Sequence, residues 1–371
     1  MIKILQLGKF FPVSGGVEKV MYDLIEGLTS EGVACDMLCT NAEPGVPYRE
    51  FDVNGCGKVM CTKALTKSCA TMVSPSLICK LRGICHDYDI IHVHHPDPMA
   101  ALALRMSGYD GKVVLHWHSD IKKQEYILRL YKPLQDWLLN RADVVVGTTP
   151  VYIPQSPHAG AYVDKSTYMP IGIDALKPEV AKVQGIRSRY RGKKIVFSLG
   201  RLVHYKGYKY LIDAARFLTD DYVVLIGGTG KLRDQLQTQI DDSRMQGRVI
   251  MLGRLSDEDL PNYFGACDVY CLSSIMKTEA FGIVQIEAMS CGKPVIATDI
   301  PASGVPWVNV DGVSGLNVPV MDGHAIADAI IRITTNSTLY SRLAAGAQER
   351  FNSLFRKETM ITRCKEIYSG L

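Results

Sequence analysis

Short apolar runs alternate with helix-length segments along almost the whole chain, and this alternation limits the folds that are open to it. Runs such as 144–146 and 223–226 contain only valine, leucine and isoleucine. Apolar strands without polar alternation are typical of parallel sheets that helices cover on both faces. Strands separated by helix-length segments form βαβ units. The sequence therefore predicts an α/β protein with doubly wound, Rossmann-like sheets.

The length of the chain and a break in this pattern predict two such domains. At 371 residues the chain is longer than one core usually serves. Prolines, a glycine and mixed charges interrupt the pattern between residues 169 and 184, before a new strand begins near residue 195. We expect an N-terminal domain over 1–175 and a C-terminal domain over 176–351, facing each other across a cleft.

The charge of the chain limits the partners it can have. The formal net charge is +4, with −1 up to residue 175 and +5 beyond it. This weak surplus excludes the strongly basic surface of a nucleic-acid-binding protein, but it suits an anionic small molecule in the second half.

The cysteines and the N-terminal residues indicate a cytoplasmic protein. The 11 cysteines show no Cys-x-x-Cys or Cys/His zinc spacing. Cys35, Cys39, Cys61 and Cys79 lie between apolar neighbours, so we expect reduced thiols in a core. The N-terminal residues predict a first strand rather than a signal peptide, and no apolar stretch approaches about 18 residues.

Glycines follow the first expected strand and precede a helix. Gly15 and Gly16 let the backbone approach a ligand closely, and the free N–H groups of a helix start favour an anion. A plain loop explains the pair equally well. No Gly-x-Gly-x-x-Gly or P-loop spacing is present to decide between the two.

The second half places cations at an equivalent position. Arg201 and Lys206 follow the strand expected over 195–199, at the edge where open α/β sheets bind ligands. A bidentate guanidinium and a mobile ammonium suit a diphosphate. Two solvated loop cations are the alternative. Gly228 lies in a further glycine-rich turn, after the strand expected over 222–226.

Two carboxylates eight positions apart accompany the start of a helix. Glu279 precedes the helix expected over 281–290, and Glu287 lies within it. The helix start offers unpaired N–H groups to an anion, while the carboxylates can accept hydrogen bonds from ligand hydroxyls. Glu287 lies in an otherwise apolar run, which argues against an ordinary surface glutamate because a buried carboxylate requires partners.

Together these motifs resemble the family 4 glycosyltransferases, which are retaining enzymes of the GT-B fold. The resemblance covers almost the whole chain in the expected order. Two glutamates separated by seven residues, an N-terminal glycine pair and a Gly-Arg…Lys-Gly phosphate clamp are the shared features, matched here by Glu279 and Glu287, by Gly15 and Gly16, and by Arg201 and Lys206.

The resemblance implies a role for each matching residue. Glu287 would bind the ribose hydroxyls and Glu279 the hydroxyls of the transferred sugar. Arg201 and Lys206 would stabilise the departing diphosphate. Backbone donors and the lining of the donor site would come from Gly15, Gly16, His118, Gly228, Phe281, Gly282 and Ile283. The donor would be a nucleotide-diphosphate sugar, with no further cofactor.

We expect no metal in the reaction. His92, His94 and His95 could pass for ligands, but strand alternation points only His92 and His94 to one face, and the family site needs no metal. Asp-x-Asp pairs at 87/89 and 257/259 are better explained by a strand start and a helix N-cap.

The resemblance also suggests the substrates. GDP-mannose is our leading donor and a lipid-linked saccharide in polysaccharide assembly our leading acceptor. A UDP-hexose-dependent transferase, a sugar-nucleotide epimerase and a catalytically inactive binding module are the alternatives.

Two further segments suggest contacts outside the active site. Residues 53–86 contain basic and apolar residues but no acidic residue. Such a segment could lie on the anionic surface of a membrane, at its cytoplasmic face; a solvated helix with one face in the core explains it equally well.

In the C-terminal segment, 352–371, apolar residues at helical spacing predict a helix that returns to the N-terminal domain, as GT-B chains commonly have.

Overall fold

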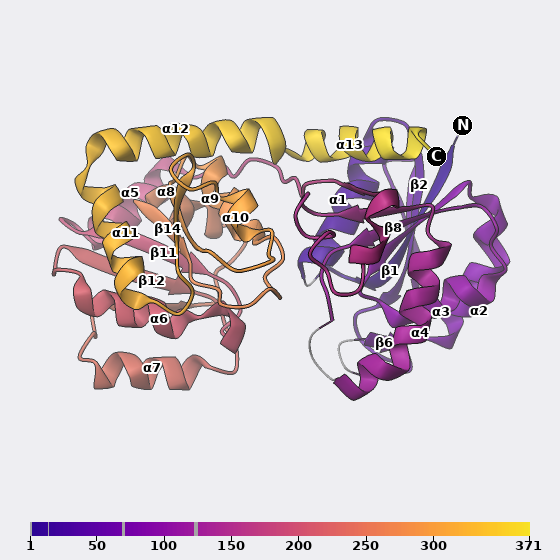
Figure 1. The fold of residues 1–371 in the computed structure, drawn as a ribbon, viewed down its shortest axis with the longest axis horizontal. Helices are drawn as coiled ribbons and strands as arrows, with labels where there is room; N and C mark the ends of the chain where they lie inside the picture. Colours follow the sequence, from indigo (N-terminus) through magenta and orange to yellow (C-terminus); the bar gives the residue numbers. More distant parts are fainter. Residues whose placement is uncertain (1, 14, 69–70, 122–124) are drawn as a thin grey trace. The chain divides into compact units, whose positions relative to one another are not determined.

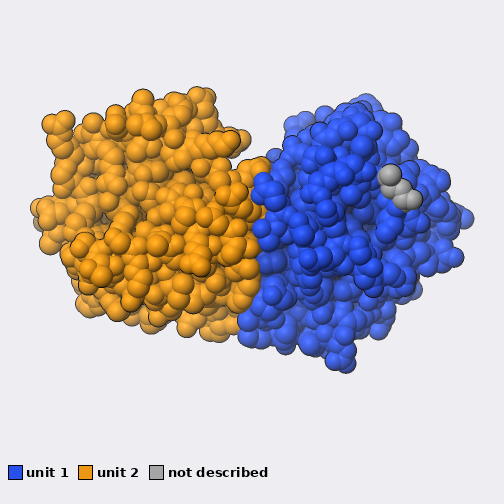
Figure 2. Space-filling view, turned by 90° about the horizontal axis from the view of Figure 1, so that it is seen from above, with its two compact units in different colours: residues 1–172, 357–371 blue, residues 173–356 orange. Residues whose placement is uncertain are grey.

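The computed structural model describes residues 2–13, 15–68, 71–121 and 125–371. The chain divides into two compact units (Figures 1 and 2). Unit 1 consists of Met1–Gly172 and Lys357–Leu371, and unit 2 consists of Ile173–Arg356. Each unit has a central, mainly parallel sheet with helices packed against it, so the predicted α/β class is confirmed. Parts of the Gly15 loop and of segment 53–86 lie outside the described residues.

Unit 1 is built on an eight-stranded sheet in the order β10-β9-β8-β7-β1-β2-β4-β3. All neighbouring strands are parallel except β3 and β4. Strands β7 and β8 are almost fully buried because helices cover both faces of the sheet. The strands are β1 Lys3–Phe11, β2 Ala34–Asn41, β3 Arg49–Val53, β4 Gly57–Thr62, β7 Ile90–His95, β8 Lys112–Trp117, β9 Val144–Gly147 and β10 Ser166–Tyr168, with a separate hairpin of β5 Thr66–Ser68 and β6 Thr71–Val73.

The helices of unit 1 begin where the sequence supplies caps. Asp97 accepts hydrogen bonds from the backbone N–H groups of Met99 and Ala100 at the start of α3, and Pro98 takes the first helical position. The helices are α1 Gly16–Ser30, α2 Pro75–Ile84, α3 Pro98–Ser107, α4 Glu125–Arg141 and α13 Lys357–Ser369, with 3₁₀ turns at Cys85–Asp87 and Gly160–Lys165.

Unit 2 has a six-stranded, fully parallel sheet in the order β13-β12-β11-β14-β15-β16. Val196, Val224 and Ile226 of the central strands pack against apolar residues of the surrounding helices. The strands are β11 Lys194–Leu199, β12 Tyr222–Gly227, β13 Val249–Gly253, β14 Val269–Leu272, β15 Val295–Thr298 and β16 Gly315–Val318. The helices are α5 Val180–Arg189, α6 Tyr208–Ala214, α7 Arg233–Asp242, α8 Leu260–Ala266, α9 Ile283–Ser290, α10 Val305–Val308, α11 Gly323–Thr335 and α12 Ser337–Leu354, with 3₁₀ turns η3 His204–Lys206 and η4 Ala215–Phe217.

The C-terminal helix α13 packs within unit 1. Ile361 of α13 lies directly against Gly27 of α1, where an added Cβ would come within 2.5 Å of Ile361. The expected returning segment of 352–371 is too long, because residues up to Arg356 belong to unit 2. Phe355 is fully buried there and its ring meets Phe281 and Trp307 edge to face, which keeps this end of the segment in unit 2.

The basic segment 53–86 is helical in one part only of its described residues. Strand β4 pairs with β2, and helix α2 over Pro75–Ile84, which buries Leu77 and Leu81, leads into the 3₁₀ turn Cys85–Asp87. Met60, Met72 and Leu81 are buried in unit 1, whereas Leu65 is 61% exposed. Many apolar residues in the described part of the segment therefore serve the core of unit 1, and membrane contact stays a prediction.

The cysteines in the described part of the chain are all free thiols. Cys35, Cys39 and Cys61 are buried as expected, but Cys79 is exposed because it lies on the outer face of α2. Across the described ranges, no helix combines the length and the apolar character needed to cross a bilayer.

Candidate active site

Two glycine turns pack on each other at the carboxyl edge of the unit 2 sheet. Gly200 follows β11 and Gly228 follows β12. A Cβ on Gly228, whose φ is 124°, would lie 1.9 Å from the carbonyl oxygen of Gly200, so only glycine fits there. The backbone N–H of Leu202 donates to the carbonyl of Thr229 at 2.9 Å. These contacts hold the loop that carries Arg201 and Lys206.

Lys206 and Glu279 form a buried ion pair at this edge. The two residues are each 8% exposed, and Lys206 Nζ lies 2.6 Å from Glu279 Oε2. Ser274 Oγ also donates to Glu279 Oε2 at 2.8 Å. An ammonium has three donors, so the pair leaves Lys206 further N–H groups for a ligand oxygen.

Arg201 lies apart from this pair. Its side chain is exposed, and Nη2 donates to Tyr205 Oη at 3.2 Å. The structure thus brings Lys206 and Glu279 together, whereas the guanidinium of Arg201 is held on the same loop by a neighbouring tyrosine. That Arg201 and Lys206 clamp a diphosphate stays a prediction.

The predicted helix after Glu279 is present as α9. It begins at Ile283, with Gly282 as its N-cap residue at a φ of 75°. Gln285 Nε2 donates to the carbonyl of Phe281 at 2.8 Å, which braces the turn into the helix. Glu287 is half-buried on α9, one turn after its start. That Phe281, Gly282 and Ile283 supply backbone donors to a nucleotide sugar stays a prediction.

Replacing Gly207 with alanine is expected to disturb the Lys206 loop. Gly207 has a φ of 65°, and a Cβ there would lie 2.1 Å from the carbonyl oxygen of Ser273. We expect a loss of about 1–3 kcal/mol in the free energy of unfolding and slower transfer, measured by urea unfolding and initial rates. Gly185→Ala, within helix α5 and with open space around the new methyl, is the control. Equal free energies of unfolding and equal initial rates in the two variants would contradict the prediction.

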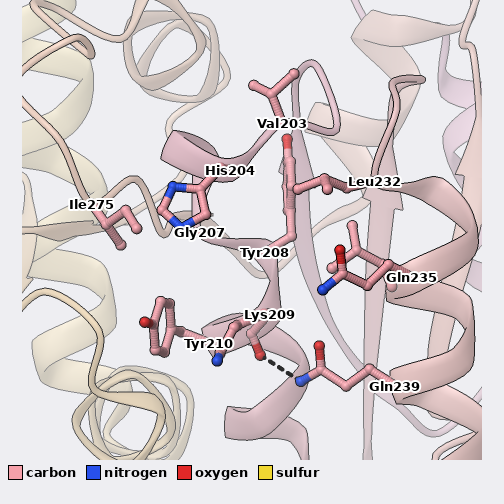
Figure 3. A pocket seen from close by; sticks show the side chains of 11 residues that line it. Val203, His204, Gly207, Tyr208, Lys209, Tyr210, Leu232, Gln235, Gln239 and Ile275 are labelled. Atoms are coloured by element: carbon pink, nitrogen blue, oxygen red, sulfur yellow. Dashed lines mark hydrogen bonds between the residues drawn. The ribbon is translucent and has the colours of Figure 1, made fainter.

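A separate pocket of about 120 Å³ lies beside this loop (Figure 3). His204, Gly207 and Tyr208 line one part of it, while Leu232 and Gln239 come from the segment around α7. Arg201, Lys206 and Glu279 do not line it. The pocket is therefore distinct from the predicted diphosphate site.

In unit 1, the predicted glycine pair begins α1. Gly15 is the N-cap residue of α1 and Gly16 its first residue, and both are exposed. The side chain of Glu18 lies over the turn, and a Cβ on Gly15 would come within 2.5 Å of its carboxylate. The pair is therefore an open helix start with an acidic side chain beside it.

His118 lies in a cluster of buried histidines at the ends of β7 and β8. His118 Nε2 is 2.9 Å from His94 Nδ1, and its ring stacks on His116 with centroids 3.9 Å apart. His94 pairs with His116 in the register of the two strands. His118 is 5% exposed, and the other histidines of the cluster are buried further.

Burial keeps these imidazoles neutral. Loss of solvation lowers the pKa of His92, His94 and His118 well below the usual value, and neighbouring histidines lower it further. Burial alone lowers the pKa of His116 to about 3. The lowered pKa favours the neutral form of His118.

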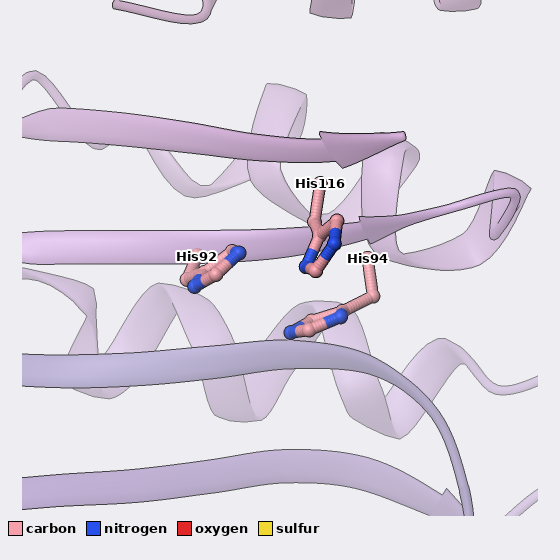
Figure 4. Close-up of side chains that lie close together, drawn as sticks. All are labelled: His92, His94 and His116. Atoms are coloured by element: carbon pink, nitrogen blue, oxygen red, sulfur yellow. The ribbon is translucent and has the colours of Figure 1, made fainter. Parts of the chain in front are cut away.

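Three members of the cluster, His92, His94 and His116, could be considered as metal ligands (Figure 4). One nitrogen of each lies within 4.8 Å of the others. Both ring nitrogens of His94 already take part in hydrogen bonds, to His118 and to Gln6 at 2.9 and 2.7 Å. A shared ion would require His94 to give up one of these bonds, so the donor set suits a metal poorly. His95, which was considered with His92 and His94, stacks on Trp117 instead.

Three residues of this neighbourhood were not predicted. Gln6, His116 and Tyr368 come from β1, β8 and α13, so their separation in sequence hid their proximity. The only signal was the alternation that places His92 and His94 on one face of β7. Which side chains oppose that face depends on strand order and on the docking of α13.

Comparison with known proteins agrees with this architecture. Residues 14–174 match the family described as Glycosyltransferase Family 4, and residues 182–350 match Glycosyl transferases group 1. The chain is 30% identical over 362 residues to O-antigen chain mannosyltransferase C of Escherichia coli, covering 96% of this chain and 95% of the relative. It is 29% identical over 345 residues to D-rhamnosyltransferase WbpZ of Pseudomonas aeruginosa, covering 92% and 88%.

Solved structures share the fold over the whole chain. HepE of Anabaena in complex with UDP has a TM-score of 0.81 at 21% identity, with all of both chains covered. Sucrose-phosphate synthase from Thermosynechococcus elongatus has a TM-score of 0.80 at 20% identity, covering 99% and 98%. The family matches and the Escherichia coli relative, together with two Rossmann-like units, identify a glycosyltransferase of the GT-B fold. The chain belongs to the family 4 glycosyltransferases.

Proposed function

We propose that this glycosyltransferase moves mannose from GDP-mannose to a hydroxyl of a lipid-linked saccharide during polysaccharide biosynthesis. The observation that carries the site assignment is the buried Lys206–Glu279 pair at the carboxyl edge of the unit 2 sheet. Mannose and a polysaccharide acceptor are suggested by the Escherichia coli relative, which is named an O-antigen chain mannosyltransferase, whereas GDP and the lipid link follow from the family resemblance.

The proposed reaction retains the anomeric configuration and uses no metal. The bond between the anomeric carbon and the diphosphate oxygen breaks, and the acceptor oxygen bonds to the same carbon from the same face. The leaving diphosphate takes the proton of the acceptor hydroxyl. Lys206 and Arg201 stabilise the negative charge that grows on the diphosphate, while Glu279 accepts hydrogen bonds from sugar hydroxyls.

GDP is expected to stabilise the protein more than UDP or ADP. A nucleotide that binds only the folded state, at about 100 times its dissociation constant, adds roughly 2.7 kcal/mol of stability. Thermal unfolding with each nucleotide at the same concentration measures the preference. Stronger stabilisation by UDP would remove GDP-mannose as the proposed donor.

Incubation with the sugar nucleotide alone separates transfer from epimerisation. A transferase leaves the donor sugar unchanged at C2 until an acceptor is added, whereas an epimerase inverts it without an acceptor. Rapid inversion at C2 in the absence of acceptor would overturn the proposed function.

We also propose that unit 1 contacts an anionic membrane surface through charge. Lys63, Lys67 and Arg82 are exposed, while few apolar residues of segment 53–86 are. Binding to vesicles of phosphatidylcholine and phosphatidylglycerol should therefore fall steeply as salt is raised. Charge reversal at Lys63 and Lys67 should abolish sedimentation with these vesicles, whereas Lys231→Glu in unit 2 should not. Salt-independent binding would contradict this proposal.

A further inference from the structure

A continuous chain of buried hydrogen bonds runs inward from His118. His118 Nε2 meets His94 Nδ1 at 2.9 Å, and His94 Nε2 meets Gln6 Oε1 at 2.7 Å. Gln6 Nε2 meets Tyr368 Oη at 2.9 Å, and Tyr368 Oη meets His92 Nδ1 at 2.6 Å. All five residues are at most 5% exposed. The chain joins strands β1 and β7 and the loop after β8 to the C-terminal helix within unit 1.

The amide of Gln6 gives this chain a direction. Its carbonyl oxygen can only accept, so His94 carries its proton on Nε2 and accepts at Nδ1 from His118. The Gln6 amide nitrogen donates to Tyr368, whose hydroxyl can then donate to His92. Each link therefore donates away from His118, and one tautomer of each imidazole satisfies the whole series.

The two ring nitrogens of His118 therefore have different roles, one as a donor and one as an acceptor. In the direction that the Gln6 amide sets, Nε2 carries the proton and donates to His94. Within the described part of the chain, no hydrogen bond involves Nδ1 of His118, whose lone pair is thus left for a ligand. A neutral imidazole held in this tautomer presents an acceptor, which suits a hydroxyl and not a phosphate oxygen.

We propose that Gln6, His94 and Tyr368 are positioning residues that hold His118 as its Nε2–H tautomer, with Nδ1 left as an acceptor for a substrate hydroxyl. The identity of that hydroxyl group rests on the proposed function, whereas the tautomer does not. Because Tyr368 lies on α13, the last helix of the chain takes part in setting the chemistry of His118.

The test measures the tautomer directly. ¹⁵N-histidine spectra of the full-length protein distinguish protonated from unprotonated ring nitrogens, and His118→Gln identifies the His118 signals by their loss. Gln6→Met removes the hydrogen bonds of the amide to His94, Tyr368 and Cys35 at nearly constant volume, and Gln6→Glu keeps the acceptor toward His94. Tyr368→Phe removes one hydroxyl from the chain. Tyr109→Phe is the matched control, because its buried hydroxyl bonds only the carbonyls of Tyr88 and Lys112.

We expect protonated Nε2 at His118 in the wild type, Gln6→Glu and Tyr109→Phe. In Tyr368→Phe the amide of Gln6 loses the acceptor of its Nε2 and can turn over, so that it donates to His94. We therefore expect a mixture of tautomers in Tyr368→Phe and in Gln6→Met, with kcat reduced by about 10-fold to 100-fold in Gln6→Met. A merely structural role would lower the stability of these variants without changing the tautomer. If Gln6→Met does not fold, the other two variants still test the inference, because we expect a mixture of His118 tautomers in Tyr368→Phe and a single tautomer in Gln6→Glu.

Two results would overturn the inference. One is an Nδ1-protonated His118 in the wild type, and the other is an unchanged tautomer ratio in the variants that break the chain. If the tautomers behave as expected but no sugar nucleotide supports transfer by the wild type, the proposed function fails while the positioning role stands.

Discussion

Replacing Lys206 with alanine is expected to lower kcat for glycosyl transfer by about 100-fold to 1,000-fold. The charge on the diphosphate grows as the glycosidic bond breaks, so a cation beside it contributes more to the transition state than to donor binding. Removal of one comparable donor from an oxyanion site costs about 2.7–4 kcal/mol. Initial rates over a range of donor concentrations separate kcat from KM. A normal kcat with only a raised donor KM would show that Lys206 contributes uniform binding.

The ion pair complicates this experiment, and the design must account for it. Lys206→Ala leaves the carboxylate of Glu279 buried without its 2.6 Å partner, which typically costs about 3–5 kcal/mol of stability. Lys206→Met combined with Glu279→Gln removes both charges and should recover stability without recovering turnover. Lys209→Ala, an exposed lysine three positions later, is the control for the loop. Recovery of turnover in the double variant would mean that the loss came from folding.

The free energy of unfolding is expected to fall steeply between pH 7 and pH 5.5. Burial lowers the pKa of five histidines of unit 1: His92, His94, His95, His116 and His118. A group whose folded pKa is depressed contributes stability above its unfolded pKa, near 6.5 for histidine, and loses it as the pH falls toward the folded value. Each histidine should cost about 1.2 kcal/mol over this range, or roughly 6 kcal/mol for five, which approaches the whole stability of many domains.

Urea unfolding at several pH values measures this loss. His116→Leu removes one buried imidazole, whose nitrogens have no hydrogen-bond partner among the described residues. The free energy of unfolding of this variant should therefore depend less on pH than that of the wild type. His324→Gln, which changes an exposed histidine of unit 2, is the control. A stability that stays flat down to pH 5.5 would show that the cluster takes up protons without unfolding.

The element types of both units could be predicted from local pattern. Strands such as Tyr222–Gly227 are apolar on both faces because helices cover both sides of a parallel sheet, so their composition alone marks them. The segment with β3 to β6 could not be predicted in this way. Strand β3 lies at the sheet edge and is mostly exposed, so it carries little apolar signal.

The residues of the candidate site could be predicted better than their contacts. Arg201, Lys206, Glu279 and Glu287 stand out because glycines, strand ends and a helix start surround them in sequence. The pairing of Lys206 with Glu279 could not be predicted, since it depends on β14 lying next to β11 in the sheet. Sequence spacing gives no information on that strand order.

For this protein, the sequence by itself determined the class of fold, the two-unit organisation and the residues that carry the family resemblance, because hydrophobic periodicity and turn chemistry act over short distances. Only the tertiary structure decided which of these side chains meet. His94 faces His116 through the register of β7 and β8, and Tyr368 reaches His92 from 276 positions away. Such contacts depend on strand order and helix docking, which are set by the packing of the whole unit and not by any local pattern.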